Sequence, residues 1–255
     1  MAAAHDHRSA GCHGCLQDQF VLPITMAFQP IIRADGSVFA QEALVRGLNG
    51  EGAGEILSQV TNANRYSFDQ RCRTTAIKTA ASLGLSNAGA ILSINFKPNA
   101  IYEPLRCLAT SLAAARKADL SNESIMFEIT EDEIVREPRR LRDIVTAYQN
   151  IGFTVALDDF GAGYSSFGLL VDIRPDVIKL DMKLVRGIDT DVVRRAIVRS
   201  MVSLCSELNI KLVAEGIETL GEYRILRSIG VGLFQGFLFA RPLIGVLQQP
   251  LMPLE

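Results

Sequence analysis

Two apolar runs separated by a five-residue linker open the body of this chain: MAFQPII (26–32), RADGS (33–37) and VFAQEALV (38–45). The linker contains Asp35 and Gly36, and an Asp-Gly pair between apolar runs is a strong signal for a β-hairpin. We therefore expect the two runs to form neighbouring antiparallel strands. A sheet built from this chain would then begin with one strand that runs against the next.

Six further strand-like runs follow, and amphipathic segments of helical length fill most of the gaps between them. Eight strands with mostly helical connections predict a TIM-like (β/α)₈ barrel, an α/β fold whose first strand is antiparallel. A doubly wound open sheet is the alternative that this pattern allows. The six runs are ILSINF (91–96), IMFEI (125–129), FTVALD (153–158), DVIKLD (176–181), IKLVAE (210–215) and GLFQGF (232–237).

Helix signals mark several of the connections. Ser67 with Gln70, and Thr219 with Glu222, have the spacing of capping boxes. Pro138 can occupy the first position of a helix. Two sets of apolar residues repeat at helical spacing and predict buried helix faces. They are Leu141, Ile144, Val145 and Tyr148 in the first helix, and Val193, Ile197, Met201, Leu204, Cys205 and Leu208 in the second.

The composition fits a single α/β domain. The chain has 255 residues, 48% of them apolar, and one such barrel needs about 250 residues. Lys and Arg number 26 against 28 Asp and Glu, a net charge of -2, which argues against bulk nucleic-acid binding. No apolar run reaches the roughly 18 residues of a membrane span, and the N-terminus lacks the apolar core of a signal peptide. We therefore expect a cytoplasmic protein that does not enter a membrane.

Residues 1–22 are polar, and we expect a flexible tail there, followed by one domain over 23–255. The tail contains one Cys-x₂-Cys pair with histidines nearby, a weak signal for metal binding or redox chemistry. An unstructured tail without either role is the alternative. The total of five cysteines is odd, which argues against a disulfide framework. The tail residues concerned are His5, His7, Cys12, His13 and Cys15.

Acidic, amide and lysine side chains fall near the ends of most predicted strands. Because the carboxyl ends of parallel strands converge on one face of a barrel, we expect these side chains to meet in one mouth. Several carboxylates so close together would repel one another, and bound divalent cations would remove the repulsion. The residues are Glu42, Asn95, Glu128, Asp158, Asp159, Lys179, Glu215 and Gln235.

The chemistry of this set indicates which cations it would bind. Oxygen ligands without His or Cys favour Mg²⁺ or Mn²⁺ over zinc. The adjacent pair Asp158 and Asp159 could hold two ions, with one carboxylate bridging them. Two such ions suit in-line displacement at phosphorus, because they stabilise both the attacking and the leaving oxygen.

Each residue of the set also has a structural explanation when taken alone. Asn95 could form a turn at the end of its strand. Glu128 could belong to an acidic helix start, which the helix dipole favours. Lys179 could form a structural ion pair. The coincidence across separate strands, and no single residue, therefore supports a shared site.

Eight short motifs in chain order cover about 26–243 and together carry a family resemblance. They are AFQPI (27–31), QEALVRG (41–47), SINFKP (93–98), FEITE (127–131), DDFGAGYSS (158–166), IKLD (178–181), VAEGIE (213–218) and FQGFLFARP (234–242). The chain resembles the EAL-domain family of cyclic di-GMP phosphodiesterases. The resemblance implies a barrel with an antiparallel first strand, in agreement with the hairpin predicted from Asp35 and Gly36.

The resemblance also implies roles for individual residues. The positions similar to ligands of a first metal ion are Glu42, Asn95, Glu128 and Asp158. The positions similar to ligands of a second metal ion are Asp158, Asp159 and Glu215. Lys179 resembles the residue that positions or deprotonates the attacking water. Gln235 resembles a second contact to that water, and Glu218 a further acidic catalytic residue.

Other matched positions lie around this set. Gln29, Arg46 and Pro242 are similar to substrate contacts, with Arg46 placed against a phosphate. The stretch from Asp159 to Ser166, which contains Gly161 and Gly163, is similar to a mobile loop that couples metal binding to dimerisation, and Glu131 is similar to the residue that anchors this loop. The segment between Arg46 and Phe68 is short and lacks acidic or aromatic features often found in the family, which leaves the guanine contacts open.

The activity implied by the resemblance is hydrolysis of cyclic di-GMP to linear pGpG with two Mg²⁺ or Mn²⁺ ions, inhibited by Ca²⁺, in a homodimer. A catalytically weak module that binds cyclic di-GMP or a protein partner is the main alternative. A lysine-dependent barrel enzyme acting on carbon acids would share Lys179 and the carboxylates. That third hypothesis does not account for the QEALVRG and DDFGAGYSS motifs.

Overall fold

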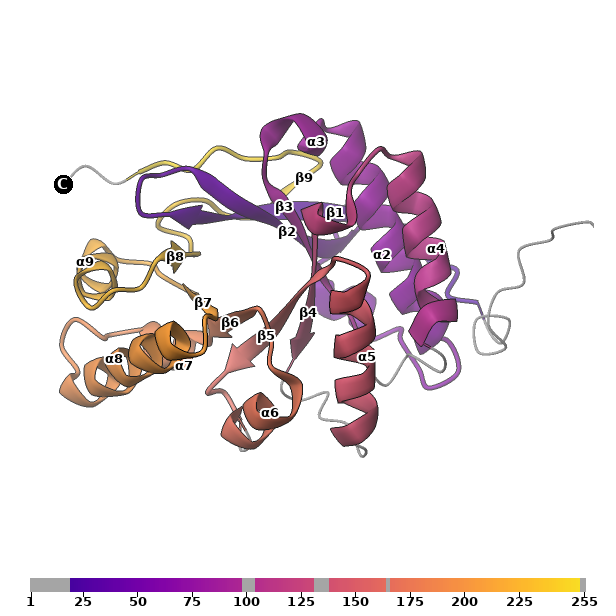
Figure 1. Ribbon diagram of the computed structural model, residues 1–255. Helices are drawn as coiled ribbons and strands as arrows, with labels where there is room; N and C mark the ends of the chain where they lie inside the picture. The colour runs from indigo at the N-terminus through magenta and orange to yellow at the C-terminus, as the bar shows by residue number, and fades with distance from the viewer. Residues whose placement is uncertain (1–18, 98–103, 131–137, 164–165, 253–255) are drawn as a thin grey trace, which may run out of the picture.

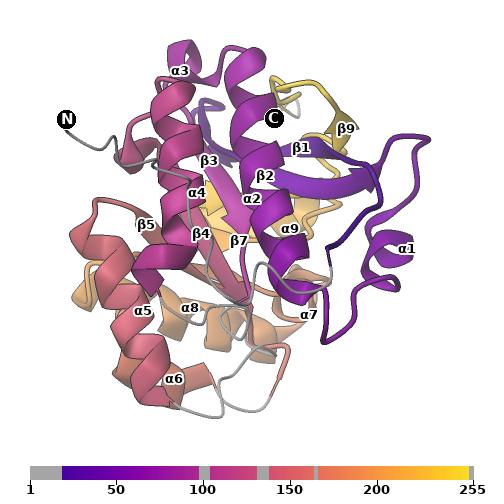
Figure 2. The ribbon, with the colours of Figure 1, turned by 90° about the vertical axis from the view of Figure 1, so that its right-hand side faces the viewer.

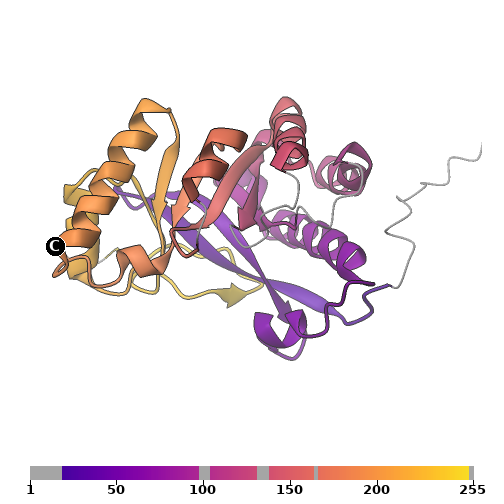
Figure 3. The ribbon, with the colours of Figure 1, turned by 90° about the horizontal axis from the view of Figure 1, so that it is seen from below.

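Strands β1 (Ile24–Arg33) and β2 (Val38–Gly47) pair antiparallel along most of their length, which confirms the predicted hairpin. In the turn between them Gly36 has φ +85°, a conformation that favours glycine. The Asp35 carboxylate accepts a hydrogen bond from the Ser37 backbone N–H at 2.9 Å. Seen from below, this long hairpin, drawn in indigo, crosses the molecule from one side to the other (Figure 3).

The computed structural model describes residues 19–97, 104–130, 138–163 and 166–252, and its sheet closes into a barrel (Figure 1). Parallel pairing runs from β2 through β8, and β1 closes the ring by pairing antiparallel with both β2 and β8. This closure confirms the TIM-like barrel and excludes the open doubly wound sheet. The parallel strands after β2 are β3 (Ile91–Asn95), β4 (Ile125–Thr130), β5 (Thr154–Phe160), β6 (Val177–Leu180), β7 (Lys211–Ala214) and β8 (Leu233–Phe234).

The last part of the sheet differs from the prediction. β8 has two residues where a run of six was expected, and a ninth strand, β9 (Leu243–Ile244), pairs antiparallel with Ala27 and Phe28 of β1. A strand of two residues is too short to show the two-residue period by which strands are predicted. The local sequence therefore could not indicate β9.

Helices cover the outside of the barrel. In Figure 2, α2 (Arg65–Ser82) and α4 (Pro104–Lys117) lie side by side, with α5 (Pro138–Asn150) next to α4. On the other side of the molecule are α8 (Val192–Glu207) and α9 (Leu220–Ser228) (Figure 1). No helix in the described part of the chain combines the length and apolar character needed to cross a bilayer. The shorter helices are α1 (Ala53–Leu57), α3 (Leu85–Ala88), α6 (Ser166–Ile173) and α7 (Met182–Val185), with a 3₁₀ turn at Asn122–Ser124.

One of the two predicted capping boxes is present. Thr219 caps α9, and its hydroxyl and the Glu222 carboxylate bond reciprocally to the backbone of the first turn. The prediction for Ser67 and Gln70 is wrong, because α2 already begins at Arg65. The Ser67 hydroxyl instead accepts a hydrogen bond from the backbone N–H of Phe20 at 2.7 Å. It thereby fixes Phe20, which is buried.

The predicted buried faces hold for one helix and partly for the other. In α5 the four predicted residues from Leu141 to Tyr148 are all buried. In α8 Met201 and Cys205 are buried and Leu204 is half-buried, but Val193 and Ile197 are exposed, and so is Leu208 directly after the helix; Val198 faces the core instead. Helical periodicity alone could not choose between two apolar stripes of the same helix.

Inside the barrel the strands carry an apolar layer followed by a polar one. Residues two apart on a strand point to the same side, so each inward apolar residue is followed by an inward polar residue nearer the mouth. The apolar layer includes Ala40, Met126, Ala156, Val177, Val213 and Leu233, which form a cluster separate from the main core. Two residues later along the same strands come Glu42, Glu128, Asp158, Lys179, Glu215 and Gln235.

Candidate active site

Lys179 lies at the centre of the polar layer. Its Nζ is 2.7 Å from Glu215 Oε1, 2.9 Å from Glu128 Oε2 and 3.0 Å from Asp158 Oδ1. Glu42 Oε2 is slightly farther, at 3.5 Å. Only 1% of the lysine side chain is exposed. Four carboxylates from four different strands or strand ends therefore surround one buried ammonium, as convergence at a barrel mouth predicts.

Glu42 is held by two amide donors, one at the end of β3 and one directly after β8. Asn95 Nδ2 donates to Glu42 Oε1 at 3.1 Å, and Gln235 Nε2 donates to Glu42 Oε2 at 2.7 Å. The predicted substrate contact Gln29 lies beside Gln235, with its own amide donating to the Ala240 carbonyl at 3.0 Å. Because both Glu42 oxygens already accept hydrogen bonds, the position of this carboxylate is fixed before any ligand arrives.

Ser93 is a member of the site that the sequence did not reveal. Its hydroxyl lies 2.5 Å from Glu128 Oε1 and donates to it, and both residues are fully buried. The available signal was register, since Ser93 precedes Asn95 by two residues and shares its inward face. Ser93 therefore fixes the orientation of a predicted metal ligand.

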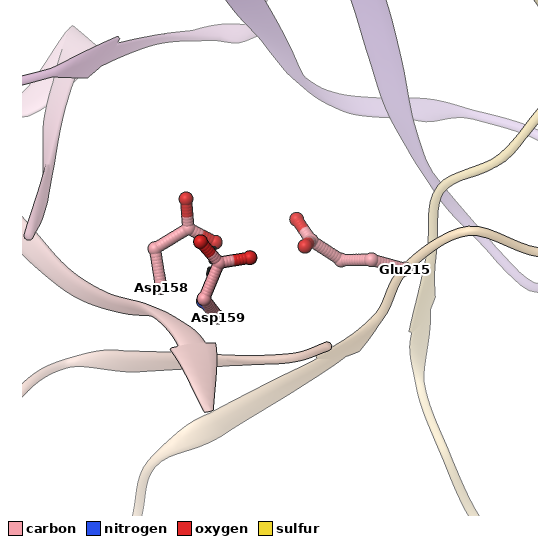
Figure 4. Close-up of side chains that lie close together, drawn as sticks. All are labelled: Asp158, Asp159 and Glu215. Atoms are coloured by element: carbon pink, nitrogen blue, oxygen red, sulfur yellow. Dashed lines mark hydrogen bonds between the residues drawn. The ribbon is translucent and has the colours of Figure 1, made fainter. Parts of the chain in front are cut away.

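The adjacent residues Asp158 and Asp159 both reach the mouth because β5 is irregular there. Successive side chains of a regular strand point to opposite faces. Here the pairing of β5 with β6 shifts register between Leu157 and Phe160, and Asp159 has φ +53°. Figure 4 shows the carboxylates of Asp158, Asp159 and Glu215 facing a common space. Oxygens of these three groups lie within 4.8 Å of one another, a spacing suited to metal coordination.

The surroundings shift the pKa values of the acids in different directions. Burial raises the pKa of Glu42, but the Lys179 ammonium and the hydrogen bonds from Gln235 and Asn95 outweigh it, so the pKa lies below its usual value. Burial dominates for Glu128 and Glu215, and it raises both pKa values well above their usual range. One ammonium cannot compensate all of the carboxylates around it.

The two aspartates and the lysine follow the same logic. Burial raises the pKa of Asp158, and burial together with the Asp158 charge raises the pKa of Asp159 to about 6. Burial lowers the pKa of Lys179, but the carboxylates, Asp158 foremost, outweigh it and hold the pKa well above its usual value. Lys179 is therefore an ammonium ion in this arrangement.

A cavity of about 300 Å³ opens above these groups. Its wall adds Leu44, Met182, Arg186 and Phe237 to the predicted residues Gln29 and Glu218. Arg186 forms an ion pair with Glu218 at the rim. The Phe237 ring lies under the guanidinium of Arg241 at 4.2 Å. None of these four additional residues was singled out from the sequence.

The remaining predicted residues lie around the cavity or outside the described chain. Arg46 is on the same face of β2 as Glu42 and Leu44, and its Nη1 donates to the Val45 carbonyl at 2.7 Å. Pro242 is half-buried between Arg241 and β9. Gly161 has φ +94° and lies against Leu184 of α7, and Gly163 is exposed. Glu131 falls outside the described residues.

Comparison with known protein families assigns the chain that carries this site to a family. The EAL domain matches residues 17–242, nearly the whole chain. This chain is a member of the EAL-domain family. The EAL barrel of Vibrio cholerae O395, a standalone EAL protein solved with c-di-GMP bound, is 46% identical with a TM-score of 0.87. The alignment covers 91% of this chain and 97% of that one.

Other EAL proteins match with lower identity. The structure of Klebsiella pneumoniae BlrP1 with manganese and cyclic di-GMP has a TM-score of 0.83 and 35% identity, covering 90% of this chain and 58% of that one. The cyclic di-GMP phosphodiesterase RocR of Pseudomonas aeruginosa is 34% identical over 62% of this chain and 41% of its own. The regulated antirepressor BluF of Escherichia coli is 28% identical over 84% of this chain and 53% of its own. The chain thus spans about half or less of these two curated relatives.

The residues of this EAL domain fit divalent cations. Carboxylate oxygens of Glu42, Asp158, Asp159 and Glu215 line the cavity, and Asn95 and Glu128 lie beside them in the polar layer. Hard oxygen donors of this kind suit Mg²⁺ and Mn²⁺. Burial raises the pKa values of Asp158, Asp159 and Glu215, and the single ammonium of Lys179 does not offset this rise.

Proposed function

We propose that this EAL domain hydrolyses cyclic di-GMP to linear pGpG with two divalent cations, Mg²⁺ or Mn²⁺. The observation that carries the proposal is the charge of the polar layer. Four carboxylates (Glu42, Glu128, Asp158 and Glu215) contact the Lys179 ammonium, and Asp159 lies close to Asp158 and Glu215. If all five acids were ionised, they would leave an excess of four negative charges. Two divalent cations would neutralise that excess.

The residues divide into two ligand groups. Glu42, Asn95, Glu128 and Asp158 would hold the first cation, and Asp158, Asp159 and Glu215 the second. Bound cations of this kind polarise a phosphodiester and lower the pKa of a coordinated water. Asp158, which stands between Lys179 and Asp159, is the residue common to both groups.

Lys179 would position the attacking water and accept its proton. As an ammonium it can donate a hydrogen bond to that water or to a phosphate oxygen but cannot accept a proton. Divalent cations nearby would reverse the local field and lower the pKa of Lys179 toward a value at which it can act as a base. Gln235, fixed against Glu42, is placed to contact the same water.

The bond changes are those of an in-line displacement. The oxygen of water forms a new bond to phosphorus, and the bond from phosphorus to one 3′ oxygen breaks. The 3′ oxygen takes up a proton and the ring opens to pGpG. Glu218 at the rim is the further acidic residue of this proposal.

The test is a metal-dependent turnover assay on the purified chain. We expect pGpG to appear by chromatography when cyclic di-GMP is added with Mg²⁺ or Mn²⁺, and no turnover in Ca²⁺ or EDTA. Calcium should still support binding, since BlrP1 of Klebsiella pneumoniae was solved with calcium and cyclic di-GMP together. Absence of pGpG with both Mg²⁺ and Mn²⁺ would refute the proposed activity.

A binding module without turnover is the second candidate. It is favoured by one comparison, because BluF of Escherichia coli is named as an antirepressor and not as an enzyme. Tight binding of cyclic di-GMP with no pGpG in Mg²⁺ or Mn²⁺ would select this second function.

We also propose that the chain forms a homodimer through α6, α7 and the start of α8. Large apolar side chains on these helices are exposed, with Val171 at 78% and Val192 at 68%. Exposed apolar residues grouped on consecutive elements are typical of protein interfaces. The others are Phe167, Met182, Val193 and Ile197.

Light scattering tests the proposed homodimer. The wild type should have twice the monomer mass, and Val171→Asp should shift the mass toward that of the monomer. A wild-type monomer would contradict the proposal.

A further inference from the structure

The rim of the active-site cavity carries an exposed ion pair. Arg186, which follows α7, contacts Glu218, which follows β7, through Nη2 and Oε1. Their side chains are 48% and 42% exposed, and both line the cavity above Lys179. An exposed ion pair contributes little to stability. The pair can therefore open at small cost when a competing anion arrives.

The charge of the cavity gives the arginine a distinct position. The described lining residues include five acids and two cations, Lys179 and Arg186. Lys179 is buried beneath the carboxylates and contacts four of them. Arg186 is the lining cation that can meet a ligand at the entrance. A substrate with two phosphodiesters brings two negative charges to a mouth that is already acidic.

A buried glutamate fixes the backbone on both sides of this pair. Glu222 Oε1 accepts a hydrogen bond from Gly187 N at 2.9 Å, and Oε2 accepts from Glu218 N and Thr219 N at 3.0 Å each. Glu222 is 5% exposed. The two loops that carry Arg186 and Glu218 are therefore tied together at the backbone. The tips of the two side chains, in contrast, reach solvent.

We infer that Arg186 binds the phosphodiester that is not cleaved and leaves Glu218 when the substrate enters. The planar guanidinium offers two parallel N–H donors to a phosphate, which makes arginine suited to this contact. Arg46, the arginine expected from the family resemblance to meet a phosphate, is not among the residues that line this cavity, and its Nη1 donates to a backbone carbonyl. The inference rests on cyclic di-GMP as the substrate of the same site.

The test is the affinity for cyclic di-GMP in Ca²⁺, measured by calorimetry, for wild type, Arg186→Met and Arg186→Lys. Arg224→Met is the matched control, because Arg224 is an exposed arginine on the neighbouring helix α9 and does not line the cavity. We expect Arg186→Met to weaken binding by about 10- to 100-fold, as for loss of a charged hydrogen bond. Arg186→Lys should recover part of the loss, and Arg224→Met should stay within about twofold of wild type.

A second variant tests the exchange of partners. Glu218→Gln removes the competitor of the phosphate for Arg186, so it should bind cyclic di-GMP at least as tightly as wild type. Wild-type affinity in Arg186→Met, or equal weakening by Arg186→Met and Arg224→Met, would overturn this inference alone. Failure of the wild type to bind cyclic di-GMP would overturn the proposed function and this inference together.

Discussion

The two halves of the active-site cluster differ in how the protein holds its carboxylates. On one side Glu42 accepts hydrogen bonds from Asn95 and Gln235, and its pKa lies below the usual value. On the other side Asp158, Asp159 and Glu215 face one another, and the pKa of each is raised. The first half is ordered by the protein's own donors. The second half lacks sufficient positive charge from the protein.

This difference indicates that the two proposed cation positions are not equivalent. A carboxylate already ionised and fixed needs no proton release to bind a cation, whereas a carboxylate with a raised pKa must lose its proton first. We therefore expect Glu42 itself to be available to its cation over a wider pH range than the other carboxylates, whose raised pKa values require proton release; these are Glu128, Asp158, Asp159 and Glu215. The Asp159 side should depend on pH and on the cation itself.

The largest loss of stability is expected from removing the Lys179 ammonium, which contacts carboxylates of both halves. Lys179→Met leaves buried carboxylates without their counterion, and breaking a buried ion pair in this way costs about 3 kcal/mol or more. For a chain of this size the melting temperature in EDTA should fall by about 10 °C. Mn²⁺ should restore part of the loss. Lys211→Met, at an exposed lysine, serves as the control in the same thermal scan, and equal melting temperatures for both variants would contradict the central role of Lys179.

Removing the Glu42 carboxylate from the ordered half should strongly reduce turnover while leaving the fold intact. Glu42→Ala deletes a predicted ligand of the first cation, and we expect turnover to fall by about 100-fold or more, equivalent to several kcal/mol of transition-state stabilisation. Initial rates of pGpG formation at saturating Mn²⁺ measure this effect. Glu207→Ala, at an exposed glutamate of α8, should keep the wild-type rate, and a Glu42→Ala enzyme with a near-normal rate would remove Glu42 from the ligand set.

A smaller effect on metal affinity is expected from removing the hydrogen bond that orients Glu128. Ser93→Ala removes the hydroxyl that donates to Glu128 Oε1. Loss of a hydrogen bond to a metal ligand typically lowers metal affinity by about tenfold. The Mn²⁺ concentration at half-maximal activity should rise by that factor, with little change in the maximal rate. An unchanged Mn²⁺ dependence would show that Glu128 is oriented by other contacts.

The smallest effect concerns Asp159 and carries a pH signature. The pKa of Asp159 is raised from 3.8 to about 6, so the folded state binds this proton more tightly than the unfolded state. The metal-free protein should therefore lose stability as pH rises from about 4 to 6. Asp159→Asn should lack this loss and be more stable at pH 7.5 by about 1 kcal/mol, a value reduced because the group is half-exposed.

The same titration governs metal binding on this side. The gain in melting temperature caused by Mn²⁺ should grow in the wild type as pH rises through about 6, because Asp159 must ionise to act as a ligand. Thermal scans from pH 5 to 8, with EDTA and with Mn²⁺, measure both effects. A wild-type gain that does not change with pH would show that Asp159 takes no part in binding.

Much of this site could be predicted from the sequence because its residues occupy inward positions in the strands or directly after them. Glu42, Glu128, Lys179 and Gln235 each follow an apolar residue by two positions, and the barrel turns that shared period into a shared interior. Ser93 obeys the same rule and could have been found by it. Arg186 could not, because it lies directly after the short helix α7, where no period relates sequence to direction.

The sequence by itself determined the hairpin, the barrel class, the EAL resemblance and the list of converging acids, since these depend on local patterns and on motifs at fixed spacing. Only the tertiary structure decided that Asp158 and Asp159 point the same way, because that depends on a register shift between β5 and β6. Only the tertiary structure decided which carboxyl groups have a lowered pKa and which a raised one, because the pKa of a buried carboxylate depends on neighbours that are far away in the chain. Burial and charge are properties of the assembled mouth, and no single strand contains them.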